Sequence, residues 1–275
     1  MCVPGCREVV RRRLNRRRFV TGSGAALAGL GAAGLAAPPR APAQSVRSFS
    51  RVVDLTHTLH ADFPTFAGRS TFALEQFLNY EADGYNSARW VVDEHTGTHM
   101  DAPIHFARDA RDAAEVPIEH LVVPLVVVDI RAKAADDPDA QLTPADLEAW
   151  EGAHGPIPEG ACVAMNSGWD AKADGVGFRN ADADGVMHFP GFHVEAADFL
   201  LREREVVGIA VDTLSLDYGP SADFAVHYGW LPANRWGMEC VANLGALPAA
   251  GATLVAGGPK VAGATGGPSR IVALV

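Results

Sequence analysis

The sequence predicts a single α/β domain, rich in strands, over residues 44–275, preceded by a short segment of different composition. Hydrophobic residues make up 48% and charged residues 20% of the 275 positions, which is an ordinary globular composition. Short valine-rich runs typical of strands recur along the chain and alternate with segments of helical periodicity. The sequence has no internal repeat, so these elements are expected to build one core.

Seven runs have the β-branched composition and the length of strands. They cover residues 51–59, 89–95, 121–130, 161–167, 205–214, 252–257 and 270–275. Two further segments are expected to be helices. The first has Thr143 as N-cap, Pro144 at the first helical position and Gly155 as a stop, and the second, 193–205, has apolar residues on one face. Loops rich in Gly and Pro join these elements.

Residues 1–43 resemble a twin-arginine (Tat) export signal. "NRRRFV" (15–20) places paired arginines before a Phe, an uncharged run of Ala and Gly follows, and "APA" (41–43) offers a cleavage site. A transmembrane anchor is the alternative, since about 20 apolar residues span a bilayer. The Ala and Gly content favours cleavage after Ala43. The mature protein is then expected to be periplasmic or secreted, with the Tat machinery as a partner and no membrane attachment.

Removal of this segment changes the charge of the chain. Residues 44–275 hold 15 basic and 32 acidic side chains, a formal net charge of −17. Nucleic acid and anionic membrane surfaces are therefore not expected as partners. Cys162 and Cys240 are the cysteines that remain in this range. Two are too few for a disulfide framework, and buried free thiols are expected.

The segment "VVDEHTGTHMDAPIHF" (91–106) concentrates side chains that bind metals. Its Thr, Gly and Pro residues disfavour a helix, so an extended chain is expected. In an extended chain, residues two apart share a face, and His95, His99, Asp101 and His105 are all odd-numbered. Four such groups converging on one point predict a transition-metal site with an open position for water. Packed core histidines would not need this spacing.

The motif "HTGTHMDAPIHF" (95–106) resembles the H-x-G-T-H-x-D-x-P-x-H-F signature of the cyclase-like metallohydrolases, a family that includes bacterial kynurenine formamidase (arylformamidase) and isatin hydrolase. The similarity extends through "DLTHTL" (54–59), "FPGFHVEAADFL" (189–200), "GIAVDTLSLD" (208–217) and "ECVANLGALP" (239–248). The resemblance implies a swivelling β/β/α fold with a barrel-like mixed sheet, and one cyclase-like hydrolase domain over 44–275.

The resemblance also implies the residues of the site. The metal ligands implied are His95, His99, Asp101, His227 and Glu239, with the two carboxylates bridging. His105 is implied to be the catalytic proton donor and acceptor. The expected cofactor is a divalent metal, two Zn²⁺ ions or alternatively Mn²⁺, since a mixed nitrogen and oxygen ligand set suits both.

These residues predict hydrolysis by metal-activated water. A divalent metal lowers the pKa of bound water from 15.7 to about 7. His105 follows the ligands directly, where it can take the water's proton and return it to a leaving nitrogen. A covalent nucleophile is the alternative, but Ser167 and Cys162 have no recognisable partner nearby in the sequence.

The substrate is expected to be a small aromatic molecule. Kynurenine formamidases carry a Trp before Pro in the N-terminal loop, and here Phe63 has that position in "HADFPTFAG". Phe66 and Trp90 are expected to add to an aromatic wall. His188 and His193 flank "FPGF", which lies towards the site in the family, and are expected to line the pocket. The missing Trp and the export signal favour an environmental amide, lactam or ester over N-formylkynurenine.

Three functional hypotheses follow. An arylformamidase-like amidohydrolase, or an isatin-hydrolase-like hydrolase of cyclic amides, fits the motif best. A periplasmic binding protein would keep the metal but need no proton shuttle, so His105 argues against it. A metal-dependent lyase or cyclase would use the same scaffold. By resemblance to the family, the chain is also expected to be a homo-oligomer.

Overall fold

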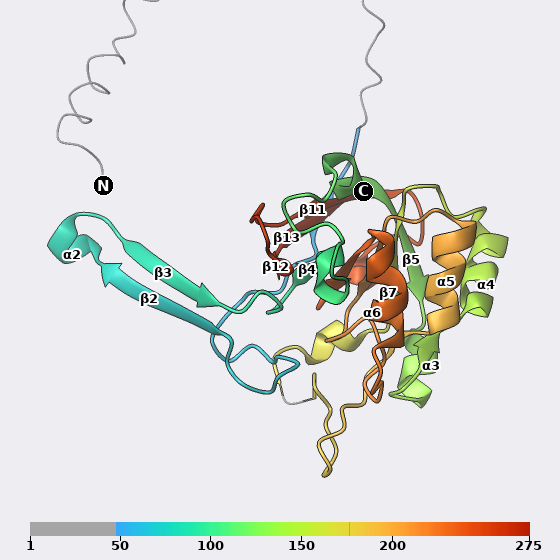
Figure 1. The fold of residues 1–275 in the computed structure, drawn as a ribbon, viewed down its shortest axis with the longest axis horizontal. Helices are drawn as coiled ribbons and strands as arrows, with labels where there is room; N and C mark the ends of the chain where they lie inside the picture. Colours follow the sequence, from blue (N-terminus) through green and yellow to red (C-terminus); the bar gives the residue numbers. More distant parts are fainter. Residues whose placement is uncertain (1–47, 176) are drawn as a thin grey trace, which may run out of the picture. The chain divides into compact units, whose positions relative to one another are not determined.

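The structure, a computed structural model, describes residues 48–175 and 177–275. The expected export signal and its cleavage site lie outside the described residues. Within them, the chain forms a nine-stranded mixed sheet with helices packed against one face (Figure 1). In this range no helix has the length and apolar character needed to cross a membrane.

The strands of the main sheet are, in chain order, β1 (Val52–Asp54), β4 (His99–Asp101), β5 (Val122–Asp129), β7 (Cys162–Asn166), β9 (Gly208–Val211), β10 (Trp236–Glu239), β11 (Ala252–Gly257), β12 (Gly266–Pro268) and β13 (Arg270–Leu274). Two small ladders pair β2 (Phe72–Leu78) with β3 (Ser87–Val92) and β6 (Gln141–Leu142) with β8 (Gly191–Phe192). The α-helices are α2 (Tyr80–Asp83), α3 (Arg131–Asp136), α4 (Pro144–His154), α5 (Val194–Glu203) and α6 (Ala225–Trp230). Short 3-10 helices include η2 (Pro103–Phe106).

The centre of the main sheet is parallel and its flanks are antiparallel. β5, β7, β9 and β10 are parallel neighbours in that order. β11, β13 and β1 extend the sheet antiparallel from β5, and β4 and β12 extend it antiparallel from β10. The sheet curls into a half-barrel, which is the strand-rich α/β architecture with a barrel-like mixed sheet that we expected from the sequence.

Alternate residues of the central strands supply two cores, one on each face of the sheet. Val126 of β5 and Val163 of β7 belong to the core that also contains residues of α4 and α5. Val127 and Ala164, one position further along, belong to the core inside the curl. Burying a valine side chain contributes about 1.5–3 kcal/mol. Because both faces are covered, these strands are continuous apolar runs, which made them recognisable in the sequence.

The two predicted helices form, with small shifts at their ends. Thr143 and Asp146 make a capping box at the start of α4, and Gly155 follows its last turn with φ 87°. An N-cap of this kind contributes about 0.5–2 kcal/mol. α5 ends at Glu203 rather than at 205, because Glu205 has a left-handed backbone conformation (φ 51°). The short α-helices and strands that were not predicted are α2, α3, α6, β2, β6, β8, β10 and β12.

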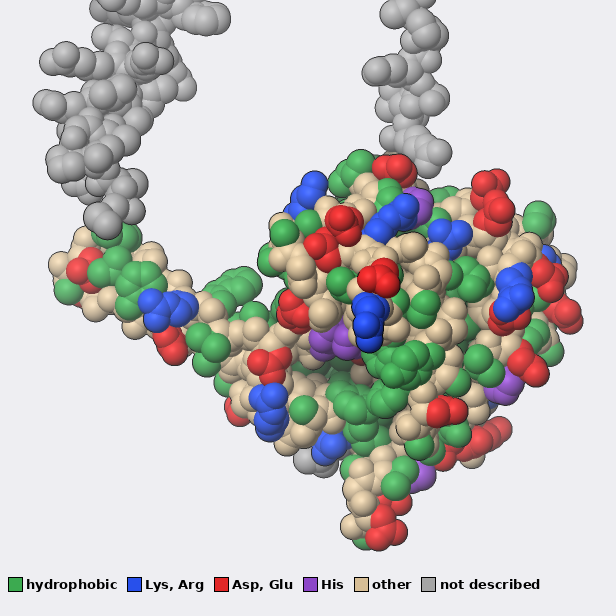
Figure 2. All heavy atoms as spheres, viewed as in Figure 1, with side chains coloured by type: hydrophobic (Ala, Val, Ile, Leu, Met, Phe, Trp, Pro, Cys, Tyr) green, Lys and Arg blue, Asp and Glu red, His purple; other side chains and the backbone are tan. Residues whose placement is uncertain are grey.

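β2 and β3 form a two-stranded arm that extends away from the main sheet (Figure 1). Six large hydrophobic side chains on this arm are each more than half exposed: Leu74, Phe77, Tyr80, Tyr85, Trp90 and Val91. Hydrophobic side chains are visible along the arm in the space-filling view (Figure 2). A two-stranded hairpin by itself is marginally stable in water.

Candidate metal centre

The residues of the histidine motif lie at the carboxyl end of the central parallel strands. His99 and Asp101 belong to β4, and His99 is the antiparallel partner of Glu239, the last residue of β10. Residues two apart on a strand, and residues directly opposite on its neighbour, share a face of the sheet. His227 reaches the same place from α6. In open α/β sheets, ligands bind at this end of the strands.

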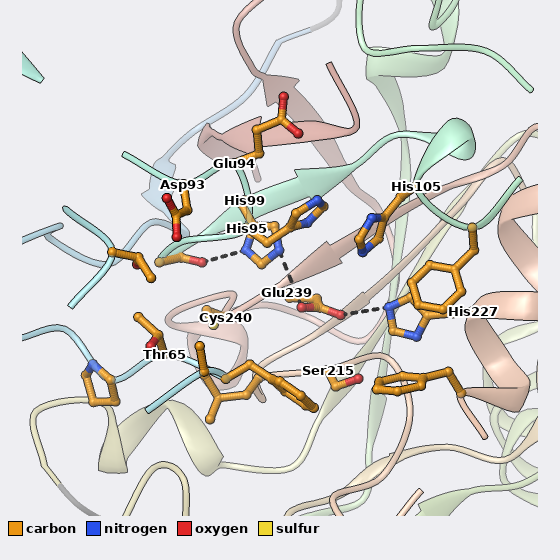
Figure 3. Close-up of a pocket in the computed structure, with 18 residues that line it drawn as sticks. Thr65, Asp93, Glu94, His95, His99, His105, Ser215, His227, Glu239 and Cys240 are labelled. Carbon is orange, nitrogen blue, oxygen red and sulfur yellow. Dashed lines mark hydrogen bonds and ion pairs between the residues drawn. The ribbon is translucent and has the colours of Figure 1, made fainter. Parts of the chain in front are cut away.

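Two groups of potential metal ligands overlap at this position, and Figure 3 shows His95, His99, His227 and Glu239 of these groups around the cavity. One consists of His95, His99 and Asp101, and the other of Asp101, His227 and Glu239. Within each group the ligand atoms all lie within 4.8 Å of one another. Asp101 belongs to both groups, as a bridging carboxylate would. The structure therefore brings together all five residues to which the family resemblance assigned metal binding.

Unsatisfied polar atoms point into this cluster. Among the described residues, His99 Nε2 and Asp101 Oδ2 are buried without a hydrogen-bond partner. His99 Nε2 lies 3.3 Å from Asp101 Oδ1 and 3.4 Å from Glu239 Oε2. His227 Nε2 lies 3.2 Å from Glu239 Oε1. An unsatisfied buried polar group costs about 1–3 kcal/mol. A divalent cation would satisfy these nitrogens and oxygens together, so the residues fit such a metal.

Two of the histidines have their second ring nitrogen held by an acceptor. His99 Nδ1 donates to the Gly97 carbonyl at 2.8 Å, and Gly97 has φ +65°, a conformation that favours glycine. His227 Nδ1 donates to Asp217 Oδ2 at 2.6 Å. In the neutral form of both rings the proton is therefore on Nδ1, and the Nε2 lone pair faces the cluster. Such outer contacts are typical of metal-binding histidines.

His95 is oriented the other way round. Its Nδ1 lies 2.7 Å from Asp101 Oδ1, and its Nε2 lies 2.9 Å from Thr265 Oγ1. The Thr265 hydroxyl donates to Glu94 Oε2, so its oxygen is free to accept the proton of His95 Nε2. This chain of contacts leaves Nδ1 as the His95 atom available to a metal.

The acidic neighbours raise the pKa of the clustered histidines. Burial lowers the pKa of His99, but the nearby carboxylates of Asp101 and Glu239 outweigh it and raise the pKa to about 9. Burial also opposes protonation of His227, and the carboxylates of Asp101, Asp217 and Glu239 raise its pKa well above the usual value. Protons on these rings therefore balance the carboxylates in the metal-free protein, and metal binding must release them.

His105 lies beside the cluster in a different backbone setting from the one the sequence predicts. It belongs to η2, which begins at Pro103, and not to an extended strand. Its ring stacks on His95 with centroids 3.8 Å apart and an interplanar angle of 22°. Burial, only partly offset by the charge of Asp101, lowers the pKa of His105 to about 4. Its imidazole is therefore neutral at neutral pH and able to accept a proton.

A cavity of about 430 Å³ opens next to these residues. Its polar side includes His95, His99, His105, His227 and Glu239, and its apolar wall includes Pro64, Phe66, Phe106, Leu214 and Phe224. Figure 2 shows histidine side chains beside a hydrophobic surface on this face of the domain. A cavity of this size and lining suits a small apolar molecule whose polar group faces the histidines.

Of the five residues expected to line the substrate pocket, Phe66 lines this cavity. Phe63 does not, because it is 4% exposed and packs in a separate core against Phe178, with ring centroids 6.0 Å apart. Trp90 does not, because it is on the β2–β3 arm, where its side chain is 68% exposed.

The two histidines that flank "FPGF" are also outside the cavity wall. His188 Nδ1 lies 2.8 Å from Asp139 Oδ2, and this carboxylate raises the pKa of His188 above its usual value. His193 is the N-cap of α5, and its Nδ1 accepts a hydrogen bond from the Glu195 backbone at 3.3 Å. Both positions are therefore explained by local contacts.

The structure does not support Ser167 or Cys162 as a covalent nucleophile. Ser167 is buried and donates to Asp212 Oδ1 at 2.5 Å, and the cavity wall includes neither Ser167 nor Cys162. Burial raises the pKa of the Cys162 thiol, which disfavours the thiolate. Cys162 and Cys240 are buried free thiols, as expected.

Two kinds of residue at this centre were not predicted from the sequence. The orienting contacts of Asp217, Thr265 and Glu94 were not anticipated, although Asp217 ends the quoted run "GIAVDTLSLD". The aromatic wall residues Phe106 and Phe224 were also missed. Phe106 is part of the histidine motif, but no sequence signal marks Phe224.

The fold and this centre define a protein of the cyclase class, and the chain belongs to the putative cyclase family, whose model matches residues 53–218. It is 35% identical to isatin hydrolase from Roseibium aggregatum over 242 residues, which cover 82% of this chain and 91% of the relative. It is 25% identical to kynurenine formamidase from Maricaulis maris over 226 residues, covering 81% and 97%. Among solved structures, isatin hydrolase A from Labrenzia aggregata bound to benzyl benzoate matches with a TM-score of 0.77 and 38% identity, covering 82% of this chain and 93% of that chain.

Proposed function

We propose that the protein is a metal-dependent hydrolase that cleaves a non-peptide C–N bond in a small aromatic amide, formamide or lactam. The observation that carries this proposal is the pair of overlapping ligand clusters beside a neutral His105, at an apolar cavity. The similarity to isatin hydrolase and to kynurenine formamidase over most of the chain supports the same reaction class.

Two ions would be held, one by His95, His99 and Asp101 and the other by Asp101, His227 and Glu239. When bound, a divalent metal supplies polarisation of a carbonyl group and activation of water at neutral pH. Zn²⁺ suits the nitrogen and oxygen ligands, with Mn²⁺ as the alternative. Elemental analysis of protein purified without chelator is expected to find about one to two equivalents of metal. Less than about a tenth of an equivalent in a fully active preparation would exclude this centre.

His105 would carry the proton. Its neutral imidazole accepts a proton from the attacking water and then donates it to the leaving nitrogen. The new C–O bond thus replaces the C–N bond, and the nitrogen leaves as an amine. Stacking on His95 holds the His105 ring beside the ligand cluster.

A cyclic amide is the first substrate to test, because the isatin hydrolases match more of the chain at higher identity than the kynurenine formamidases do. Metal-loaded protein is incubated with isatin, N-formylkynurenine and a simple aryl ester, and the product masses are followed. The expected product of isatin is heavier than isatin by one water. The expected products of N-formylkynurenine and of the ester are two molecules whose summed masses exceed the substrate mass by one water. Products whose summed masses equal the substrate mass would indicate a lyase, and an unchanged mass with measurable binding would indicate a binding protein.

We also propose that the chain is exported by the Tat pathway and cut after Ala43, which rests on residues 1–43 alone. Replacing Arg16 and Arg17 with Lys is expected to leave the precursor in the cytoplasm. Arg7→Lys, outside the paired arginines, is the matched control and is expected to be exported normally. Equal periplasmic recovery of both variants would contradict the proposal.

We further propose that the chain forms a homo-oligomer, as we expected from the family resemblance. The exposed hydrophobic side chains of the β2–β3 arm support this proposal, since a second copy would remove them from water.

A further inference from the structure

Phe224 has a backbone conformation that its side chain disfavours. Its φ of 50° and ψ of 44° are left-handed. Gly adopts this conformation readily, Asn and Asp adopt it at times, and bulky residues are outliers there. A strained residue of this kind persists where surrounding structure or function requires it. The question is therefore which requirement keeps a phenylalanine at this position.

The helix that follows does not need the phenylalanine side chain. Phe224 is the N-cap of α6, but its side chain makes no capping hydrogen bond. Asp217 caps the helix instead, because its carboxylate accepts from the backbone N–H of Val226 at 2.8 Å and of His227 at 3.2 Å. The Phe224 carbonyl accepts from Tyr228 N at 2.9 Å, a contact that any residue provides. Glycine or asparagine would serve this backbone at least as well.

The phenyl ring is instead part of the cavity wall. Its centroid lies 6.0 Å from that of Phe66, 5.7 Å from that of Phe106 and 5.8 Å from that of His227. These partners come from the loop before β2, from η2 and from α6, so the ring joins three separate segments around the cavity. Phe224 is only partly buried, which leaves part of its ring surface to a bound molecule.

We propose that Phe224 is a specificity-determining residue, whose ring stacks on the planar ring of an aromatic substrate. Phe66 and Phe106 complete the wall, so that the substrate's carbonyl group is directed towards His105. This inference rests on the proposed function for the aromatic nature of the substrate. A planar π-system gains from ring stacking beyond its buried area, whereas a saturated ring of similar size gains the burial alone.

The test compares the binding of benzoate and cyclohexanecarboxylate to the zinc-loaded protein by calorimetry. The wild type is expected to bind benzoate about three- to ten-fold more tightly, the range of one aromatic pair. Phe224→Leu keeps an apolar side chain and is expected to reduce this preference to less than about two-fold. An unchanged preference in Phe224→Leu overturns the inference, whether or not the protein hydrolyses amides.

Because binding is measured without turnover, the inference and the proposed function fail separately. A preference that is present in the wild type and lost in the variant supports the role of Phe224 even if no amide is hydrolysed. If the protein hydrolyses an aryl amide but Phe224→Leu keeps the preference for benzoate over cyclohexanecarboxylate, the proposed function is supported and the proposed role of Phe224 is wrong.

A matched pair of glycine variants separates binding from packing. Glu205 has the same left-handed conformation (φ 51°) but is exposed and outside the cavity wall. Glu205→Gly is expected to keep the benzoate preference and to melt at or above the wild-type temperature. Phe224→Gly is expected to lose the preference, and its melting temperature is expected to fall because the ring contacts with Phe66 and Phe106 are lost. A benzoate preference that survives in Phe224→Gly overturns the inference.

Discussion

Replacing Asp217 with Asn tests whether the orientation of His227 is built into the protein. Asp217 is 2% exposed and accepts hydrogen bonds from Val226 N at 2.8 Å, from His227 N at 3.2 Å and from His227 Nδ1 at 2.6 Å. Asparagine has the same shape but offers one acceptor oxygen and a donor amide. With the oxygen kept on Val226 N, the amide faces His227 Nδ1. The ring proton is then expected to move to Nε2, the atom that faces the ligand cluster.

This change removes the Nε2 lone pair from the metal centre while leaving all five proposed ligands in place. Loss of an outer contact to a metal-binding histidine costs about 10–100-fold in metal affinity. That range corresponds to about 1.4–2.7 kcal/mol. It is close to the contribution of one charge-assisted hydrogen bond, about 1.5–3 kcal/mol. We therefore expect the zinc dissociation constant of the site that contains His227 to rise by about 10–100-fold.

Competition between the metal-free protein and a zinc chelator measures this constant, and ¹⁵N NMR of His227 reports which ring nitrogen carries the proton. Ser221→Ala is the matched control, because the Ser221 hydroxyl contacts Asp217 Oδ1 and Asp223 Oδ1, each at 3.3 Å, and does not contact His227. The control is expected to change zinc affinity by less than about two-fold. Wild-type affinity in Asp217→Asn, with the His227 proton still on Nδ1, would refute the reasoning.

Three other changes test the centre and the assembly. His105→Ala is expected to keep its metal and to lose about 10²–10⁴-fold in kcat. Asp101→Ala removes the carboxylate common to both ligand groups, so it is expected to lose metal and activity together. Equal metal loss in both variants would place His105 among the ligands. The pKa of His99 is raised from 6.5 to about 9, so its contribution to the stability of the metal-free protein is complete below pH 6.5 and lost as pH rises through about 9. Thermal melts in chelator across this range are expected to show falling stability, and a rising melting temperature would contradict the assignment. Leu74→Lys on the exposed arm is expected to reduce the particle mass in light scattering to that of one chain. Val194→Lys, at an exposed position outside the arm, is the control and is expected to keep the mass of the oligomer. Oligomers formed by both variants would exclude the arm as the contact between copies.

The sequence by itself determined the features that depend on local spacing. β5 and β7 were recognisable because strands covered on both faces are continuous apolar runs. α4 was recognisable because Thr143 and Pro144 specify a helix start. His99 and Asp101 were correctly expected to share a face, because side chains two apart on a strand point the same way. Each of these properties is set by neighbouring residues and does not require knowledge of the rest of the chain.

Only the tertiary structure decided which distant segments meet. The pairing of β10 with β4 sets Glu239 opposite His99, and α6 brings in His227. Asp217 and Phe224 gain their roles from the same packing, one by orienting His227 and the other by closing the cavity. Trp90 was misplaced for the same reason, because the direction of the β2–β3 arm depends on contacts that sequence spacing does not encode. Strand register and side-chain burial are decided by the free energy of the whole core, whereas the hydrophobic periodicity of an element and the capping of a helix are decided within a few residues.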